Sequence, residues 1–111
     1  MQNANRVAIV APRMAKIFTY EQAVELLPAV RQITDDAVAH VEELDENDAD
    51  GYHRLLMKWV ESLTTLGIEV KGLWLVDFDN GSGYYCWRHP EPALEYFHGY
   101  EEGFGGRVKL N

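Results

Sequence analysis

The chain has 111 residues, a length that fits one domain with a modest core, and 47% of them are hydrophobic, which is typical of a folded protein. Its net charge of −8 and pI near 4.8 repel phosphate backbones, and no basic stripe offsets them, so a nucleic-acid partner is disfavoured. The single cysteine excludes an intramolecular disulfide and an all-cysteine zinc site.

The first part of the chain contains its longest apolar run, residues 7–11. This run is far too short to span a bilayer, and its flanks do not fit a signal peptide. We therefore expect a soluble, cytoplasmic protein with no membrane partner. Residues 1–16 are predicted to be an N-terminal extension, either an arm or an edge strand, and residues 17–111 a single domain.

Residues 19–45 have the pattern of an amphipathic helix. Thr19 can cap its first turn, with Gln22 completing a capping box. Steps of three and four then separate the apolar positions of one face, which are Ala23, Leu27, Val30, Ala37, Val41 and Leu44. Pro28 lacks a backbone donor, so it predicts a kink or a restart of the helix.

A second helix is predicted after the polar turn at residues 45–51. Its apolar stripe again has steps of four and three, through Tyr52, Leu56, Trp59, Leu63 and Leu66. Gly67 suits the left-handed cap that ends a helix. Two stripes joined by a short turn predict an antiparallel helical hairpin over residues 19–66.

A β-meander and a tail are predicted for residues 67–111. Residues 73–78 and 84–88 are rich in strand-forming side chains, and Asn80-Gly81 between them is a strong hairpin signal. Residues 94–98 form a third candidate strand, and residues 99–111 a glycine-rich loop that returns over the sheet. The prediction is an α+β fold in which an antiparallel helical hairpin packs on a small, about three-stranded antiparallel β-sheet with a Gly-rich C-terminal tail.

Two stretches resemble known metal-site motifs, an EF-hand loop and a zinc deaminase signature, but each lacks a required residue or segment. Aligning Gly51 with the glycine of an EF-hand loop puts Met57 where a bidentate glutamate is needed. His89-Pro90-Glu91 matches half of a zinc deaminase signature, but no P-C-x-x-C segment follows it. The acidic turn is expected to be solvated, and no cofactor is predicted.

His98 and Glu101 form a weak candidate for a metal site at the end of a predicted strand. A metal would need a third ligand, for which Asp77, Glu91 and Cys86 are the nearest candidates by topology. The alternative is that His98 hydrogen-bonds a carboxylate or carbonyl and fixes the tail.

Cys86 and Arg107 also allow two interpretations each. Cys86 would need a base and an electropositive, partly open setting to act as a nucleophile, for which Arg88 and His98 are candidates; buried cysteines are otherwise inert. Arg107 follows a glycine-rich segment that would suit an anion, but pairing with an acid such as Glu91, Glu101 or Asp77 is favoured.

Polar groups at strand ends beside aromatic residues are a common way to build a shallow pocket. The candidate pocket residues are Asp77, Trp87, Arg88, Glu91, His98, Glu101 and Arg107. Whether they converge depends on strand register, which the sequence does not fix.

Several stretches of the chain resemble a family of uncharacterised bacterial proteins, the domain of unknown function 2203 family. The similarity covers about residues 17–110. It rests on residues 18–23, 26–28, 30–31, 66–71, 75–78 and 86–88, on Glu91-Pro92, and on His98, Gly103-Phe104 and Gly106-Arg107. His89 departs from the family pattern, which makes it a poor candidate for shared chemistry. The resemblance implies a fold and a site location but no reaction.

We therefore expect a non-catalytic domain that binds a partner or a small-molecule ligand and forms a homo-oligomer, most simply a dimer, because two helices and three strands leave apolar surface uncovered. The alternative is a small metal-dependent or acid–base hydrolase that uses His98 and Glu101, with Arg88 or Arg107 holding an anionic group.

Overall fold

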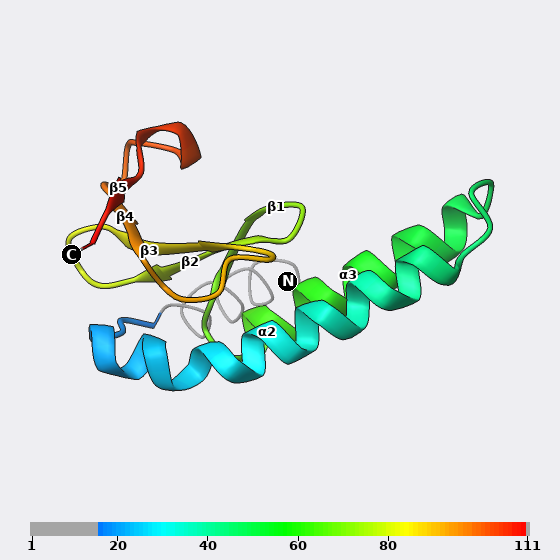
Figure 1. Ribbon diagram of the computed structural model, residues 1–111, viewed down its shortest axis with the longest axis horizontal. Helices are drawn as coiled ribbons and strands as arrows, with labels where there is room; N and C mark the ends of the chain where they lie inside the picture. The colour runs from blue at the N-terminus through cyan, green and yellow to red at the C-terminus, as the bar shows by residue number, and fades with distance from the viewer. Residues whose placement is uncertain (1–15, 111) are drawn as a thin grey trace, which may run out of the picture.

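A helical hairpin and a five-stranded sheet form the protein, as the computed structural model of residues 16–110 shows (Figure 1). The elements are α2 (Tyr20–Glu43), α3 (Ala49–Thr65), β1 (Glu69–Gly72), β2 (Leu75–Asp79), β3 (Tyr84–Arg88), β4 (Tyr96–His98), the 3-10 helix η1 (Phe104–Gly106) and β5 (Val108–Lys109). The predicted α+β class is confirmed. The predicted arm or edge strand before residue 16 lies outside the described residues.

Helix α2 begins at the predicted cap. The Thr19 hydroxyl accepts a hydrogen bond from the Gln22 backbone at 3.1 Å, and the Gln22 side chain accepts one from the Thr19 backbone at 2.9 Å. The helix is continuous through Pro28, so a restart there is wrong, and Figure 1 shows that α2 changes direction along its length. Leu27 and Val30, buried on either side of the proline, anchor both parts to the core.

Helix α3 runs back beside α2. The Asp48 side chain caps it by accepting a hydrogen bond from the Gly51 backbone at 2.9 Å. Gly67 follows the helix with a φ of 86°, the left-handed conformation predicted for it. A buried hydrogen bond of 2.9 Å from the Trp59 indole to the Thr34 hydroxyl joins the two helices. The predicted antiparallel hairpin is therefore confirmed.

The sheet is an antiparallel meander in which every strand pairs with its neighbour in the chain, in the order β1-β2-β3-β4-β5. The prediction of about three strands is wrong because it omitted β1 and β5. Strand β1 is a short Glu-Val-Lys-Gly segment, and β5 has two exposed residues. Pairing with β2 and β4 defines these edge strands, and neither has a strong pattern of its own.

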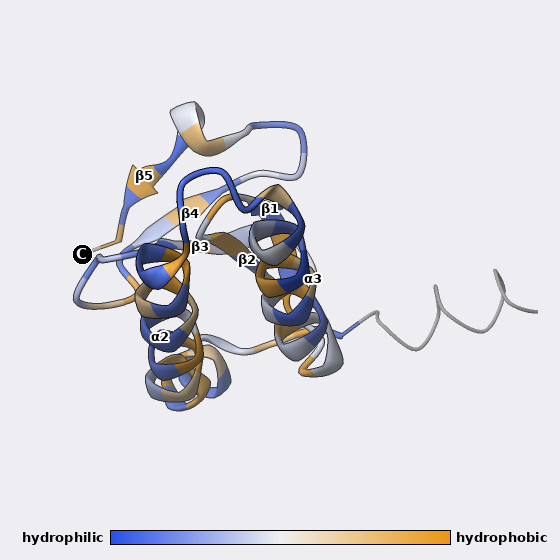
Figure 2. Ribbon diagram, turned by 90° about the vertical axis from the view of Figure 1, so that its right-hand side faces the viewer, coloured by the Kyte–Doolittle hydropathy of each residue, from blue (hydrophilic) through white to orange (hydrophobic). Residues whose placement is uncertain are grey.

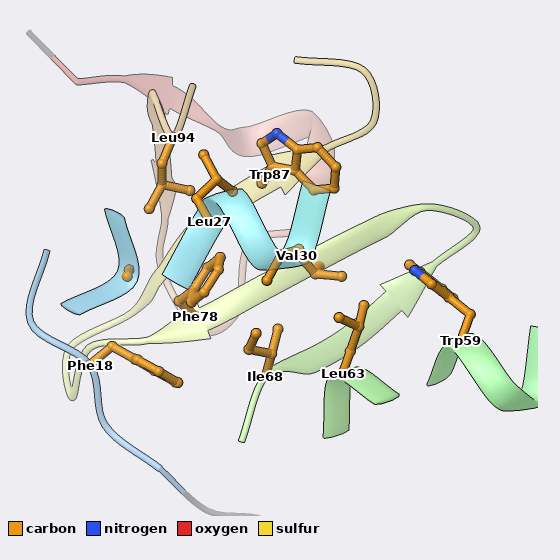
Figure 3. Packing of buried hydrophobic residues seen from close by; sticks show 11 residues of the cluster. Phe18, Leu27, Val30, Trp59, Leu63, Ile68, Phe78, Trp87 and Leu94 are labelled. Atoms are coloured by element: carbon orange, nitrogen blue, oxygen red, sulfur yellow. The ribbon is translucent and has the colours of Figure 1, made fainter. Parts of the chain in front are cut away.

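One face of the sheet carries the apolar core. Val76, Phe78 and Trp87 alternate toward the helices and are fully buried there. Figure 3 shows how the side chains from the two helices meet those from the strands. The core consists of Phe18, Ala23, Leu27, Val30, Trp59, Leu63, Ile68, Val76, Phe78, Trp87 and Leu94.

The opposite face of the sheet is covered by the C-terminal tail. Figure 2 shows η1 and the edge strand β5 on one side of strands β1 to β4 and the two helices on the other. Within the described part of the chain, neither helix has the length and apolar character needed to cross a membrane. The sheet thus lies between a helical layer and a thin layer formed by the tail.

Candidate functional site

Three side chains with metal-binding or acid–base chemistry meet on the face of the sheet beneath the tail. Asp77 on β2 lies opposite Cys86 on β3, and His98 comes from the adjacent strand β4. All three are buried, with exposed fractions of 1%, 1% and 4%. One nitrogen, oxygen or sulfur atom from each lies within 4.8 Å of the other two. We call these residues the Asp-Cys-His cluster.

Both ring nitrogens of His98 are engaged. Nε2 lies 3.1 and 3.0 Å from the two carboxylate oxygens of Asp77. Nδ1 lies 2.9 Å from the Gly99 carbonyl oxygen, and because a carbonyl only accepts, Nδ1 donates this hydrogen bond. The ring is therefore fixed between a buried carboxylate and the first residue of the tail.

Lys71 supplies the nearest positive charge. The register of β1 against β2 shifts between Val70 and Gly72, and this bulge contains Lys71. Its Nζ lies 3.0 Å from Asp77 Oδ2 and 3.7 Å from the centre of the Tyr84 ring. Burial alone would lower the pKa of Lys71, but the hydrogen bond and the charge of Asp77 raise it above its ordinary value. Lys71 is thus a cation.

The Cys86 thiol is held in its protonated form. Burial, followed by the neighbouring Asp77 carboxylate, raises the pKa of Cys86 to about 12. The guanidinium Nη1 of Arg107, at 3.8 Å from Sγ, acts in the opposite direction without reversing the shift. In this state the thiol is a poor nucleophile.

Arg107 ties the tail to the sheet. It donates two parallel hydrogen bonds to the Glu91 carboxylate, at 3.1 and 2.8 Å, so Glu91 is the partner among the three acids that the sequence left open. Its guanidinium also stacks at 3.8 Å from the Tyr96 ring centre and 4.1 Å from that of Phe104. Burial alone would lower the pKa of Arg107, but the bonds to Glu91 raise it.

A cleft of about 380 Å³ opens between the tail and the Asp-Cys-His cluster. We call it the tail cleft. Lys71 is the one lysine or arginine among its lining residues, which also include three acids, Asp77, Glu101 and Glu102. The remaining lining residues are Leu75, Cys86, His98, Tyr100, Gly103 and Phe104.

A larger hollow of about 500 Å³ lies between α2 and residues 92–94. Its charged side chains, Arg31 and Asp35, are not buried, so they are already solvated and carry no comparable chemistry. The tail cleft is the better candidate, because only there do buried ionisable groups line the cavity.

The structure brings together some of the residues predicted for the pocket. Asp77 and His98 are in direct contact, and Glu101 lies exposed at the tail cleft. Glu91 and Arg107 form the adjacent ion pair. These five lie on the tail side of the sheet.

Two predicted residues do not join them. Trp87 lies on the opposite face, in the apolar core, where its indole donates to the Glu91 carbonyl at 2.9 Å. Arg88 is exposed at the end of β3, with its guanidinium 5.4 Å from the Phe104 ring centre. Neither lines the tail cleft.

Sequence reasoning missed Lys71 and Tyr100, which line the tail cleft. The available signal for Lys71 was the polar-apolar-polar alternation of Glu69, Val70 and Lys71 directly after the Gly67 cap. Tyr100 lies in a stretch without periodicity. Its hydroxyl donates to Asp79 at 2.7 Å, a contact between β2 and the tail that only the fold reveals.

The architecture defines a class of small α+β domain, in which one face of a meander sheet carries the core and the other carries a buried polar cluster under a tail. Residues 45–110 match the sequence profile of a family described as "Uncharacterized conserved protein (DUF2203)", and the chain belongs to this family. The match begins before α3 and includes the whole sheet and tail, so it contains every residue of the Asp-Cys-His cluster. Comparisons with curated proteins and with solved structures gave no match.

Proposed function

We propose that this protein is a non-catalytic binding domain that holds a small, positively charged ligand in the tail cleft. The supporting observation is the charge of that cleft, in which three carboxylates face one ammonium group. The innermost carboxylate, Asp77, is 1% exposed, so it attracts a cation with little screening by solvent. The aromatic rings of Tyr100 and Phe104 offer further favourable contacts for a cation.

The same geometry argues against acid–base hydrolysis by His98. A general base needs a free nitrogen within reach of the proton that it removes, and both nitrogens of His98 are occupied. Glu101, the other half of the predicted catalytic pair, is exposed at the mouth of the cleft. Arg107, the candidate for holding an anion, has its guanidinium committed to Glu91.

Nuclear magnetic resonance of the isotope-labelled chain tests the proposal. The probes are methylamine, guanidinium and Zn²⁺ as cations, with acetate and inorganic phosphate as matched anions. We expect at least one cation to shift the backbone amide signals of Gly99 and Gly103 in a saturable manner, and the anions to leave them unchanged. Signals that move only with anions, or with none of the five probes, would contradict the proposal.

A pair of variants locates the binding. Asp77→Asn removes the charge at the floor of the cleft and is expected to abolish the cation response. Asp35→Asn removes an exposed carboxylate on α2 that does not line the tail cleft, and this variant is expected to retain the response. An equal response in the two variants would place binding elsewhere.

We also propose that the domain self-associates through its hairpin. Figure 1 shows that the far ends of α2 and α3 extend well beyond the sheet. Half-buried apolar side chains line hollows between the two helices, among them Ile33, Ala37, Val41 and Leu55. A second copy of the hairpin would cover this stripe.

Light scattering coupled to size-exclusion chromatography tests self-association. We expect a dimer at high micromolar concentration, and a monomer for Val41→Lys with an unchanged circular dichroism spectrum. Ala29→Lys, on an exposed part of α2, serves as the matched control and should remain dimeric. A wild-type chain that stays monomeric throughout the concentration series would refute this part.

A further inference from the structure

We propose that Asp77, Cys86 and His98 form a binding site for a zinc-like divalent transition-metal ion. This inference rests on the proposed function, because it names the cation that the tail cleft takes. The three side chains project from the paired strands β2, β3 and β4, so a rigid sheet sets their spacing.

The donor atoms are close to a coordinating arrangement. In a tetrahedral zinc site with Zn–N near 2.0 Å and Zn–S near 2.3 Å, ligand atoms lie about 3.3 to 3.6 Å apart. Here the His98 nitrogen and the Asp77 oxygen are 3.0 Å apart, and all three donors lie within 4.8 Å of one another. Adjustments of about 1 Å, within the reach of side-chain rotation, would complete the geometry.

The donor types select the class of metal. One thiolate, one imidazole and one carboxylate suit zinc and its neighbours, whereas calcium and magnesium prefer oxygen ligands alone. His98 is also held as metal-ligating histidines usually are, since Nδ1 donates to the Gly99 carbonyl and orients Nε2 toward the other two donors.

The surrounding charges allow a divalent ion to enter. Lys71 now neutralises Asp77, but its side chain is 35% exposed, so the ammonium can turn into water when an ion replaces it. When a divalent ion binds, the Cys86 thiol releases its proton to the solvent as the metal–sulfur bond forms, and the ion then balances the charges of the Asp77 carboxylate and the Cys86 thiolate. The Arg107 guanidinium, at 3.8 Å from Sγ, remains paired with Glu91 and adds no uncompensated charge.

Three protein ligands leave one tetrahedral position free, as in open zinc sites. All three residues line the tail cleft, so this position faces the space bordered by Tyr100 and Glu101. Water or a donor atom of a second ligand would occupy it. The buried cluster would thus become the floor of a site with room for one further small group.

Cobalt titration of the chelator-treated full chain tests the metal site. Co²⁺ bound by a thiolate and an imidazole gives ligand-field bands and a thiolate-to-cobalt charge-transfer band, which Zn²⁺ should remove by competition. We expect saturation at one ion per chain. Cys86→Ser should lose the charge-transfer band, and His98→Gln should bind at least about tenfold more weakly.

Lys71→Met provides a test that does not depend on removing a buried side chain. Removing the competing ammonium from Asp77 should tighten Co²⁺ binding by roughly tenfold. Lys58→Met, on the exposed surface of α3, removes the same charge from the protein and should leave the affinity unchanged. If the Asp-Cys-His cluster had only a structural role, Lys71→Met would not bind Co²⁺ more tightly than the wild-type chain.

The outcomes separate this inference from the proposed function. A saturating cleft response to methylamine or guanidinium, with no stoichiometric Co²⁺ binding, would overturn the metal site and leave cation binding intact. An unchanged Co²⁺ spectrum in Cys86→Ser would also overturn the metal site, because the ion would then lie elsewhere. If neither the organic cations nor the metal ions bind in the cleft, both proposals fail.

Discussion

The helix-covered face of the sheet and the tail-covered face bury their side chains by different means. On the helix-covered face, Phe78 and Trp87 pack against α2 and α3. The hydrophobic effect that favours their burial does not depend on the direction of individual contacts. On the second, Asp77 and His98 are buried to a similar extent but depend on hydrogen bonds with fixed partners. The first face therefore supplies stability, and the second holds groups in the positions that a ligand would need.

The two faces also differ in what covers them. Two long helices cover the apolar face, whereas the polar face lies under the tail of residues 99–110. Arg107 and the pairing of β5 with β4 attach this tail to the sheet. A thin cover leaves room for the tail cleft. Substitutions on the two faces should consequently differ in how much they lower the free energy of unfolding and in where they accelerate hydrogen exchange.

The largest expected effect is on the apolar face. Phe78→Ala removes a fully buried ring that packs edge-on against Phe18 and should lower the free energy of unfolding by about 3 to 5 kcal/mol. Urea denaturation measures the loss. Leu73→Ala, at a position 51% exposed, should change it by less than about 0.5 kcal/mol. Similar losses in the two variants would contradict the assignment of the core.

The second-largest loss of unfolding free energy is expected for a substitution on the polar face. Asp77→Asn removes the negative charge that Lys71 and His98 share and should cost about 3 kcal/mol of unfolding free energy. The loss is at the lower end for a buried ion pair because Lys71 can reach solvent. Urea denaturation again provides the measurement, with Asp35→Asn as the exposed control. A loss no greater than that of the control would show that the cluster contributes nothing to stability.

A smaller, local effect is expected where the tail attaches. Arg107→Met removes the paired hydrogen bonds to Glu91 and should lower global stability by only about 1 to 2 kcal/mol. Hydrogen exchange should accelerate at the Leu110 amide, which bonds to the Glu95 carbonyl, but not at β2 and β3. Arg54→Met, which removes an exposed guanidinium from α3, should leave exchange unchanged. Uniform acceleration over the sheet would mean that the tail is part of the main folding unit.

The smallest effect concerns the rim of the polar face. The hydrogen bond to Asp79 raises the pKa of Tyr100 to about 12, because ionising the phenol would bring two negative charges together. Asp79→Asn should therefore lower this pKa toward 10, with tyrosinate appearing earlier between about pH 10 and 12. Ultraviolet titration follows the change, and Tyr100→Phe assigns the signal. An unchanged titration curve would show that Tyr100 and Asp79 are not in contact.

The parts of the fold that depend on local signals could be predicted from the sequence. The Thr19 capping box, the left-handed Gly67 and the stripes of α2 and α3 all involve residues within a few positions of one another. The Asn80-Gly81 turn likewise specified the hairpin of β2 and β3. Strands β1 and β5 were missed because pairing with a neighbour, and not their own composition, makes them strands.

The candidate site could be predicted only in part, because its geometry depends on strand pairing between residues that are not adjacent in the sequence. Asp77, Cys86 and His98 were all identified as chemically capable, and the family resemblance is confirmed over residues 45–110. Their convergence required the register that places Asp77 opposite Cys86, and a shift by one residue would have turned one of them to the other face. Trp87 was also predicted as a pocket residue, but alternation along β3 sends its side chain to the apolar core.

The strand order of the meander also has a consequence for biosynthesis. Because each strand pairs with the one made just before it, β1 to β4 can assemble in the order in which they leave the ribosome, with short loops to close. The tail that covers the tail cleft is translated after β2, β3 and β4, the strands that carry the Asp-Cys-His cluster. A released chain whose tail has not yet closed over the sheet would thus expose Asp77, Cys86 and His98 to the surrounding solution, where a cation could reach them.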